Sequence, residues 1–116
     1  MPRFLRPPMG CFNHGLLRVV AERGYRPVLG DVYPQDTARP GRDVIVHRVL
    51  ERIAPGSIVI LHDGSLYRRA DRSQSLDAVE ALLPRLRDLG YALGTVSELV
   101  ASEAREAAGG ASEPAA

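Results

Sequence analysis

One histidine of this sequence lies at a position that suits acid–base chemistry. His62 ends the apolar run "SIVIL" and opens "HDG", so an ionisable ring directly follows a predicted buried strand. A polar side chain is costly to bury there unless it has a partner. An imidazole titrates near neutrality and can give or take a proton. We therefore interpret His62 as a general acid or base; the alternative is a histidine that only hydrogen-bonds a neighbouring loop.

Two carboxylates and one arginine are candidate partners. Asp36 lies in the turn-rich stretch 31–41 and can orient His62, as the aspartate of a catalytic His–Asp pair does. Asp31 can do the same, and either residue is equally well explained as a turn residue bonded to its own backbone. Arg6 follows a short apolar run and either pairs with a buried carboxylate or is a solvated arginine on an edge strand.

Other kinds of site are poorly supported. The sequence holds no His-x-x-x-His, no cysteine pair and no Gly-rich phosphate loop. The single cysteine, Cys11, cannot form an internal disulfide, and we expect it to be a small buried apolar residue. Arg68, Arg69 and Arg72 form the closest basic cluster, which a solvated loop explains better than a phosphate site.

The composition is that of one small globular domain. The chain has 116 residues, is 45% hydrophobic and 25% charged, and has a net charge of +1. Such a charge suggests neither nucleic acid nor an anionic membrane surface as a partner. No run approaches the roughly 18 apolar residues of a membrane helix. The N-terminus does not resemble a signal peptide, and the compartment stays open.

The elements that must position these groups alternate along the chain. Short apolar runs predict strands, and apolar residues at helical spacing predict helices between them. The predicted strands are 3–5, 25–30, 57–61 and 91–96, and the predicted helices are 13–23, 42–54, 74–90 and 97–107. The run 57–61 is typical of a strand buried on both faces. We expect residues 108–116 to be a disordered tail.

Particular residues predict where the helices begin, end or bend. Asn13 and Ser97 are the expected N-caps of the first and last helices, and Gly24 the expected stop of the first. Pro84 predicts a kink or break in the third helix.

This alternation predicts an α/β fold with parallel strands joined by crossover helices. In such folds ligands gather at the carboxyl ends of the strands. Arg6, Asp31, Asp36 and His62 all follow predicted strands, so we expect their side chains at one edge of the sheet.

Four stretches in order resemble a known family: "FLRPPMG", "GYRPVLGDVYPQD", "PGSIVILHDG" and "ALLPRLRDLGYALGTVSELV". Over residues 3–100 they are similar to the second half of the polysaccharide deacetylases, which carry the NodB homology domain and form carbohydrate esterase family four. The resemblance implies a partial NodB homology domain over residues 1–107. The implied fold is the C-terminal half of a distorted (β/α) barrel.

The resemblance also implies an activity, the hydrolytic removal of N- or O-acetyl groups from carbohydrate. It implies a divalent metal such as zinc, held by one aspartate and two histidines. On the matching positions His62 corresponds to the general acid, Asp36 to the carboxylate that tunes it, and Arg6 to the arginine that pairs with the catalytic base.

The substrate-facing positions depart from the family pattern. Ile60, with Leu61 beside it, stands where the family usually has a leucine walling the acetyl pocket. Met9 replaces a common aromatic residue, and Thr37 replaces the usual tryptophan. These changes favour a divergent subgroup or a small substrate.

The family's Thr-Phe-Asp-Asp and His-x-x-x-His stretches are absent from this sequence. By resemblance the chain therefore lacks the base and all three metal ligands. We expect it to start in the middle of a barrel, through a truncated gene model, a fragment or a split gene, and to be inactive alone. The alternatives are a non-catalytic α/β module and a half-barrel that self-associates through an exposed sheet edge.

Overall fold

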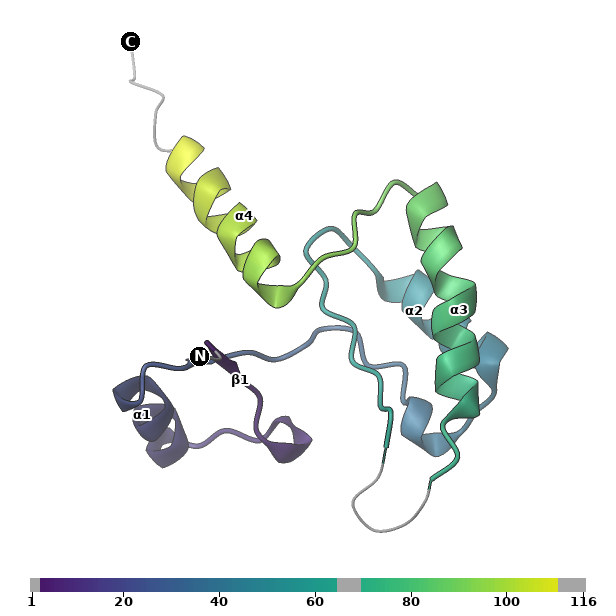
Figure 1. Cartoon of the computed structure of the whole chain (residues 1–116), viewed down its shortest axis with the longest axis horizontal. Helices are drawn as coiled ribbons and strands as arrows, with labels where there is room; N and C mark the ends of the chain where they lie inside the picture. The colour runs from purple at the N-terminus through teal and green to yellow at the C-terminus, as the bar shows by residue number, and fades with distance from the viewer. Residues whose placement is uncertain (1–2, 65–69, 111–116) are drawn as a thin grey trace.

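The computed structural model of the chain describes residues 3–64 and 70–110 (Figure 1). Its elements are β1 (Phe4–Leu5), 3-10 helix η1 (Pro8–Gly10), α1 (His14–Glu22), β2 (Arg26–Pro27), 3-10 helix η2 (Asp36–Ala38), α2 (Arg42–Arg52), α3 (Ser73–Asp88) and α4 (Val96–Gly109).

The N-terminal elements form a βαβ unit with parallel strands, as the alternation predicts. Phe4 pairs with Arg26 and Leu5 with Pro27. The predicted strand 25–30 is shortened to two residues. Pro27 has no N–H to give to a ladder, which limits the pairing that this strand can make.

The run 57–61 is less regular than predicted. Within the described residues its only strand pairing is a parallel bridge between Val32 and Val59, and its residues are half-buried rather than buried on both faces. Side chains of an extended chain alternate between two sides. Val59 and Leu61 pack against the core, whereas Ile60 lies against Gly30, so both faces of this run are only partly covered.

The prediction of a strand over 91–96 is wrong. Residues 91–95 form no strand, and Val96 already belongs to α4. The N-cap of α4 is Thr95 rather than Ser97: the Thr95 side chain accepts from the Glu98 N–H, and the Glu98 carboxylate accepts from the Thr95 N–H. This reciprocal capping box explains why the chain turns into a helix at this point.

Other predicted boundaries are confirmed. The Asn13 side chain accepts a 2.8 Å hydrogen bond from the Leu16 N–H and caps α1. Gly24 follows α1 with a φ of +75°, a conformation that favours glycine. Pro84 predicted a kink or a break, and the break is absent, because α3 continues through Pro84 to Asp88. Pro84 is exposed, so water can satisfy the carbonyl that its missing N–H leaves free.

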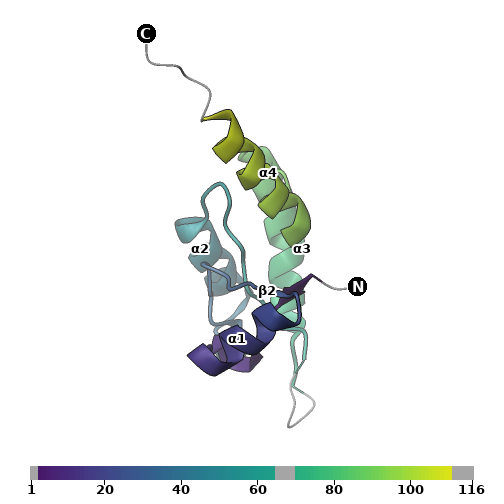
Figure 2. The same ribbon diagram turned by 90° about the vertical axis from the view of Figure 1, so that its left-hand side faces the viewer.

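The core lies between α2 and α3, which run side by side in both views (Figures 1 and 2). Its buried members are Val32, Ile45, Val46, Val49, Ala78, Leu82 and Leu86. In contrast, Val20 is the buried residue of α1, and no residue of α4 is buried.

The described structure is open. Its Cα radius of gyration is 17.3 Å, whereas a compact domain of this length has about 13 Å. No helix in residues 3–64 and 70–110 is long and apolar enough to cross a membrane. Helix α4 runs to Gly109, beyond the boundary predicted at 107. Residues 111–116 of the predicted tail lie outside the described residues.

Candidate active site

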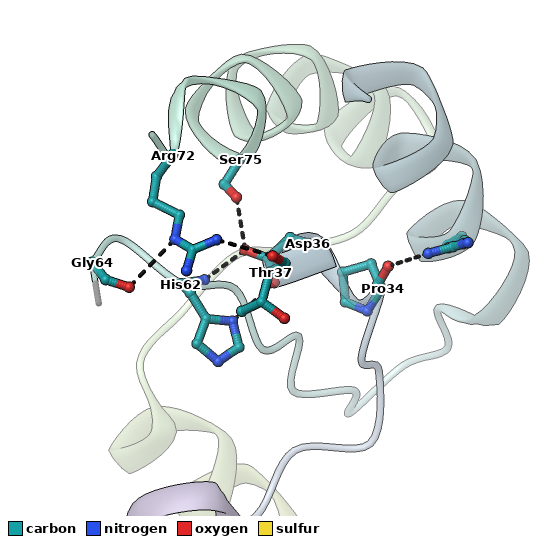
Figure 3. Close-up of polar contacts among 8 residues, drawn as sticks. Pro34, Asp36, Thr37, His62, Gly64, Arg72 and Ser75 are labelled. Atoms are coloured by element: carbon teal, nitrogen blue, oxygen red, sulfur yellow. Dashed lines mark hydrogen bonds and ion pairs between the residues drawn. The ribbon is translucent and has the colours of Figure 1, made fainter. Parts of the chain in front are cut away.

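Asp36 and His62 are in direct contact (Figure 3). The His62 ring Nδ1 lies 2.9 Å from Asp36 Oδ1, and the His62 backbone N–H donates a 2.8 Å hydrogen bond to Asp36 Oδ2. An ionised carboxylate only accepts hydrogen bonds, so the ring must donate through Nδ1–H. This contact leaves Nε2 as the nitrogen available for proton transfer.

The two partners differ in exposure. Asp36 is 1% exposed, while the His62 side chain is 47% exposed. The ring therefore reaches solvent while its partner is shielded from it, which is the arrangement of an acid–base group held by a buried orienting carboxylate.

The carboxylate of Asp36 is stabilised as an anion. Burial raises the pKa of Asp36, but hydrogen bonds from the Ser75 hydroxyl, the His62 ring and the His62 backbone outweigh it. The resulting pKa lies below the ordinary aspartate value of 3.8. Ser75 Oγ donates the 2.7 Å bond to Asp36 Oδ2. Asp36 is thus charged and rigidly held at neutral pH.

The loop that carries Asp36 is tightly constrained. Gln35 and Arg39, which flank η2, both have left-handed backbones with φ of +57° and +56°. Such conformations cost free energy in residues other than glycine and persist only where surrounding contacts enforce them. Arg48 of α2 supplies one such contact, because its Nη1 donates a 2.9 Å bond to the Pro34 carbonyl.

Asp31 does not join the pair. Its carboxylate accepts from the Ser57 hydroxyl at 2.8 Å and from the Ile58 N–H at 2.6 Å, at the start of the run that His62 ends. Burial raises the pKa of Asp31, but these donors outweigh it and lower the pKa. The structure therefore gives Asp31 the task of fixing the loop to residues 57–58.

Arg6 and Met9 lie apart from the pair, in the N-terminal unit. Arg6 is exposed, and its Nε donates a 3.3 Å bond to the Val28 carbonyl. Met9 is 95% exposed within η1. Cys11, expected to be buried, is exposed, and its Sγ lies 3.6 Å from the Met9 carbonyl oxygen.

The two residues predicted to wall the acetyl pocket have different neighbours. Leu61 packs against the α2–α3 core. Ile60 lies against Gly30, where an added Cβ would come within 2.3 Å of Ile60 Cγ1. Gly30 is therefore the small residue that lets Ile60 approach the preceding loop.

Sequence reasoning missed two residues that touch the site. Ser75 bonds Asp36, and Arg72 donates to the Thr37 carbonyl at 3.4 Å and to the Gly64 carbonyl at 3.3 Å (Figure 3). Arg72 was predicted to be solvated, but it is half-buried. Its companions Arg68 and Arg69 lie outside the described residues. No spacing signal links 36, 62 and 72–75, because only the tertiary fold brings them together.

Among residues 3–64 and 70–110, no three histidine, cysteine, aspartate or glutamate side chains are placed to hold a metal ion. The described part of the chain therefore does not fit the metal site of polysaccharide deacetylases, which are generally metal-dependent.

Comparison with known proteins finds related sequences, although no family model matches the chain. The chain is 41% identical over 101 residues to the peptidoglycan-N-acetylglucosamine deacetylase of Bacillus cereus, covering 85% of this chain and 46% of that protein. It is 37% identical over 106 residues to a chitooligosaccharide deacetylase of a Bradyrhizobium strain, covering 85% of this chain and 48% of that protein.

Solved structures give the same result. The peptidoglycan deacetylase PdaC of Bacillus subtilis matches with a TM-score of 0.73 and 34% identity, covering 91% of this chain and 48% of that one. A family-four pseudoenzyme of Bacillus anthracis matches with a TM-score of 0.70 and 27% identity, covering 84% and 32%.

The chain spans about half the length of the curated relatives it matches. The matched fold is part of the α/β barrel of these deacetylases, as the sequence predicts. Over the matched residues, the chain is therefore similar in sequence and fold to the polysaccharide deacetylases of carbohydrate esterase family four.

Proposed function

We propose that this chain supplies the general acid of a carbohydrate deacetylase site. His62 is that acid, and Asp36 is the carboxylate that orients it. The reaction is hydrolysis of an acetyl amide or ester on a sugar, as the names of the relatives indicate for those proteins. The observation that carries the proposal is the 2.9 Å contact between a half-exposed imidazole and a buried carboxylate.

The geometry suits donation of a proton to a leaving amine. Asp36 holds Nδ1–H and favours the imidazolium by its charge, so the proton to be delivered is on Nε2. As the acyl C–N bond breaks, this proton passes to the sugar nitrogen, which leaves as a neutral amine. His62 becomes a neutral imidazole, which Asp36 still holds in the Nδ1–H tautomer.

The remaining site residues keep more modest roles in the proposal. Ile60 is the apolar wall against which an acetyl methyl group rests, and Leu61 beside it anchors this wall to the α2–α3 core. Met9 belongs to the sugar-facing surface, where its full exposure suits contact with a ligand. Arg6 is the partner of the catalytic base. No acidic group of residues 3–64 or 70–110 forms an ion pair with Arg6, so this last role depends on residues outside the described ones.

The described residues do not supply a metal site. The resemblance implies a zinc or similar divalent ion for the proposed reaction, but the described residues do not fit it. The chemistry proposed for the described residues rests on His62 and Asp36.

A chimaera tests this proposal. The region of the Bacillus cereus deacetylase that this chain matches is replaced by the matching residues of this chain, and acetate release from a chitooligosaccharide is measured. General acid catalysis contributes about 10²–10⁴-fold, so His62→Ala should lower kcat by that factor with metal content unchanged. His47→Ala is the matched control, because His47 is an exposed histidine on α2 and should have no effect. Loss of metal in His62→Ala would contradict the role given to His62.

A non-catalytic module is the second candidate. It is favoured by the missing metal cluster among the described residues and by the match to a pseudoenzyme. If the chain is such a module, the chimaera should fold but release no acetate, even when its circular dichroism and metal content equal those of the parent enzyme. Self-association through an exposed edge, also proposed, would appear as a dimer mass in size-exclusion chromatography with light scattering.

A further inference from the structure

The start of α3 faces the Asp36–His62 pair. Ser75, in the first turn of α3, is 4% exposed and donates its hydroxyl to Asp36 Oδ2 at 2.7 Å. The same oxygen accepts from the His62 backbone N–H, while Oδ1 faces the His62 ring. A carboxylate held by one partner can rotate about its Cβ–Cγ bond. Ser75 adds a second donor to Oδ2 from a different element, α3, and so keeps Oδ1 turned toward Nδ1.

Arg72 joins the two loops that carry the pair. Its Nη1 donates to the carbonyl of Thr37, the residue after Asp36, and its Nε donates to the carbonyl of Gly64, two residues after His62. Both bonds are at or beyond the long end of the usual range, so each is weak alone. Because both bonds come from one planar guanidinium, together they fix the separation of the two loops.

Arg72 also occupies a helix position, the N-cap, at which arginine is not a preferred residue. It is the N-cap residue of α3 and makes no capping hydrogen bond with its side chain. Serine, threonine, aspartate and asparagine are the residues that stabilise a helix there. The neighbouring Asp71 accepts from the Ser73 N–H instead. The side chain of Arg72 is thus directed to the loops and not to its own helix (Figure 3).

We propose that Ser75 and Arg72 are positioning residues of the proposed acid. Ser75 fixes the orientation of the Asp36 carboxylate, and Arg72 fixes the separation of the Asp36 and His62 loops. Neither residue touches the substrate in this proposal, which depends on the proposed function of His62. Their removal should loosen the Nδ1–H contact of His62 without unfolding the chain.

Nuclear magnetic resonance of the full chain with ¹⁵N-labelled histidine tests Ser75. The measured quantities are the tautomer of neutral His62 and the exchange rate of its Nδ1 proton. In Ser75→Ala the exchange rate should rise about tenfold, the effect of losing one hydrogen bond to a charged group. The pKa of Asp36 should also rise toward its ordinary value. Ser75→Thr keeps a hydroxyl and should restore both.

Ser57→Ala is the matched control. Ser57 donates the same kind of hydrogen bond to Asp31 at 2.8 Å. Its removal should raise the pKa of Asp31 and leave the His62 proton unchanged. If Ser75 had a purely structural role, Ser75→Ala and Ser57→Ala would lower the urea midpoint by similar amounts. The exchange rate of the His62 Nδ1 proton would then be the same in the two variants.

The same measurement tests Arg72. Arg72→Lys keeps the charge but cannot span two carbonyls with a planar group, so it should accelerate exchange as Arg72→Gln does. Arg85→Gln is the control, since Arg85 is exposed on the same helix. If Arg72→Lys matched the parent chain, a bridging role for Arg72 would be excluded.

The outcomes separate this proposal from the function on which it depends. If the parent chain lacked the Nδ1–H tautomer of His62, the proposed acid would be wrong, and the positioning proposal with it. If the parent had that tautomer and Ser75→Ala and Arg72→Gln left it and its exchange unchanged in folded chains, the positioning proposal alone would be wrong. Circular dichroism establishes that each variant is folded, and recovery in Ser75→Thr supports the proposal.

Discussion

The α2–α3 region and the N-terminal βαβ unit bury their apolar side chains to very different degrees. Ile45 and Val49 of α2 are completely buried, against a facing row on α3. In the βαβ unit Val20 is buried, but Leu17 and Val19 of the same helix are 38% and 48% exposed. The difference separates the candidate residues too: Asp36 and His62 belong to the packed region, whereas Arg6 and Met9 belong to the open one.

Packing density decides how firmly each set of candidate residues is held. A packed neighbourhood holds side chains in single arrangements, so the Asp36–His62 contact is defined by its surroundings. In the open unit, Arg6 is exposed and contacts the Val28 carbonyl, and Met9 is 95% exposed. Substitutions in the two regions should therefore differ in their cost to stability.

Truncation of the core should have the largest effect. Ile45→Ala removes a fully buried side chain and should lower the free energy of unfolding by about 2–5 kcal/mol. Leu17→Ala, in the open unit, should lower the free energy of unfolding by clearly less, because the Leu17 side chain is already 38% exposed. Urea denaturation followed by circular dichroism measures both. Equal losses would show that the two regions do not differ as described.

A methyl group at the junction of the two regions should be the next most costly change. In Gly30→Ala the new Cβ would meet Ile60 Cγ1 at 2.3 Å and the Ile58 carbonyl oxygen at 2.8 Å. Overpacking of this kind costs about 1–3 kcal/mol. Gly64→Ala is the control, because no atom of the described residues lies within 4 Å of its added Cβ. Denaturation midpoints that coincide for the two variants would refute the close approach at Gly30.

Removal of the Asp36 charge should have a pH-dependent effect. The pKa of Asp36 in the folded chain lies below its ordinary value, so its charge stabilises the fold above about pH 4, and this contribution is lost as the pH falls toward the folded pKa. At pH 7, Asp36→Asn should therefore cost about 1–3 kcal/mol, and the gap to the parent should close on acidification.

Asp31→Asn provides the comparison for that experiment. Asp31 is exposed, although its pKa is lowered in the same direction, so its substitution should cost less at pH 7. A gap between parent and Asp36→Asn that stayed constant from pH 7 to pH 3 would contradict the lowered pKa of Asp36.

Loss of the α4 cap should have the smallest effect. Thr95→Ala removes the side-chain acceptor of the Glu98 N–H and half of the capping box. No residue of α4 is buried, so helix α4 should fray while the α2–α3 region stays intact. Hydrogen exchange should therefore accelerate in α4 alone. Accelerated exchange in α3 would mean that α4 supports the core.

Much of this fold could be predicted from local sequence signals. Asn13 and Gly24 mark the ends of α1 because caps act within a few residues of chain. The 42–54 helix was recognisable because its apolar residues recur at helical spacing and become the core of the protein. The order of elements also predicted parallel pairing, which β1 and β2 show.

The failures have a common physical origin. The runs 57–61 and 91–96 have the composition of strands, but a strand exists only through its neighbours, and the described residues provide 57–61 with a single bridge and 91–96 with none. Ser97 was predicted as the N-cap of the last helix from its residue type, but the reciprocal contact with Glu98 makes Thr95 the N-cap.

The candidate site was likewise predicted only in part. The proximity of Asp36 and His62 followed from the rule that loops after parallel strands converge. Ser75 and Arg72 could not be found, because a serine in a first helical turn and an arginine in a loop are common and carry no signal of their own.

The central claim is that Asp36 orients His62 for proton transfer through Nε2. The ¹⁵N shifts of the His62 ring in the full chain, compared with those of Asp36→Asn, test it most directly. Neutral His62 should carry its proton on Nδ1 in the parent chain, and Asp36→Asn should shift the population toward Nε2–H. The ring of exposed His47 should be the same in both chains. If His62 had the same tautomer mixture in both chains, Asp36 would not orient the ring, and the proposed acid would be wrong.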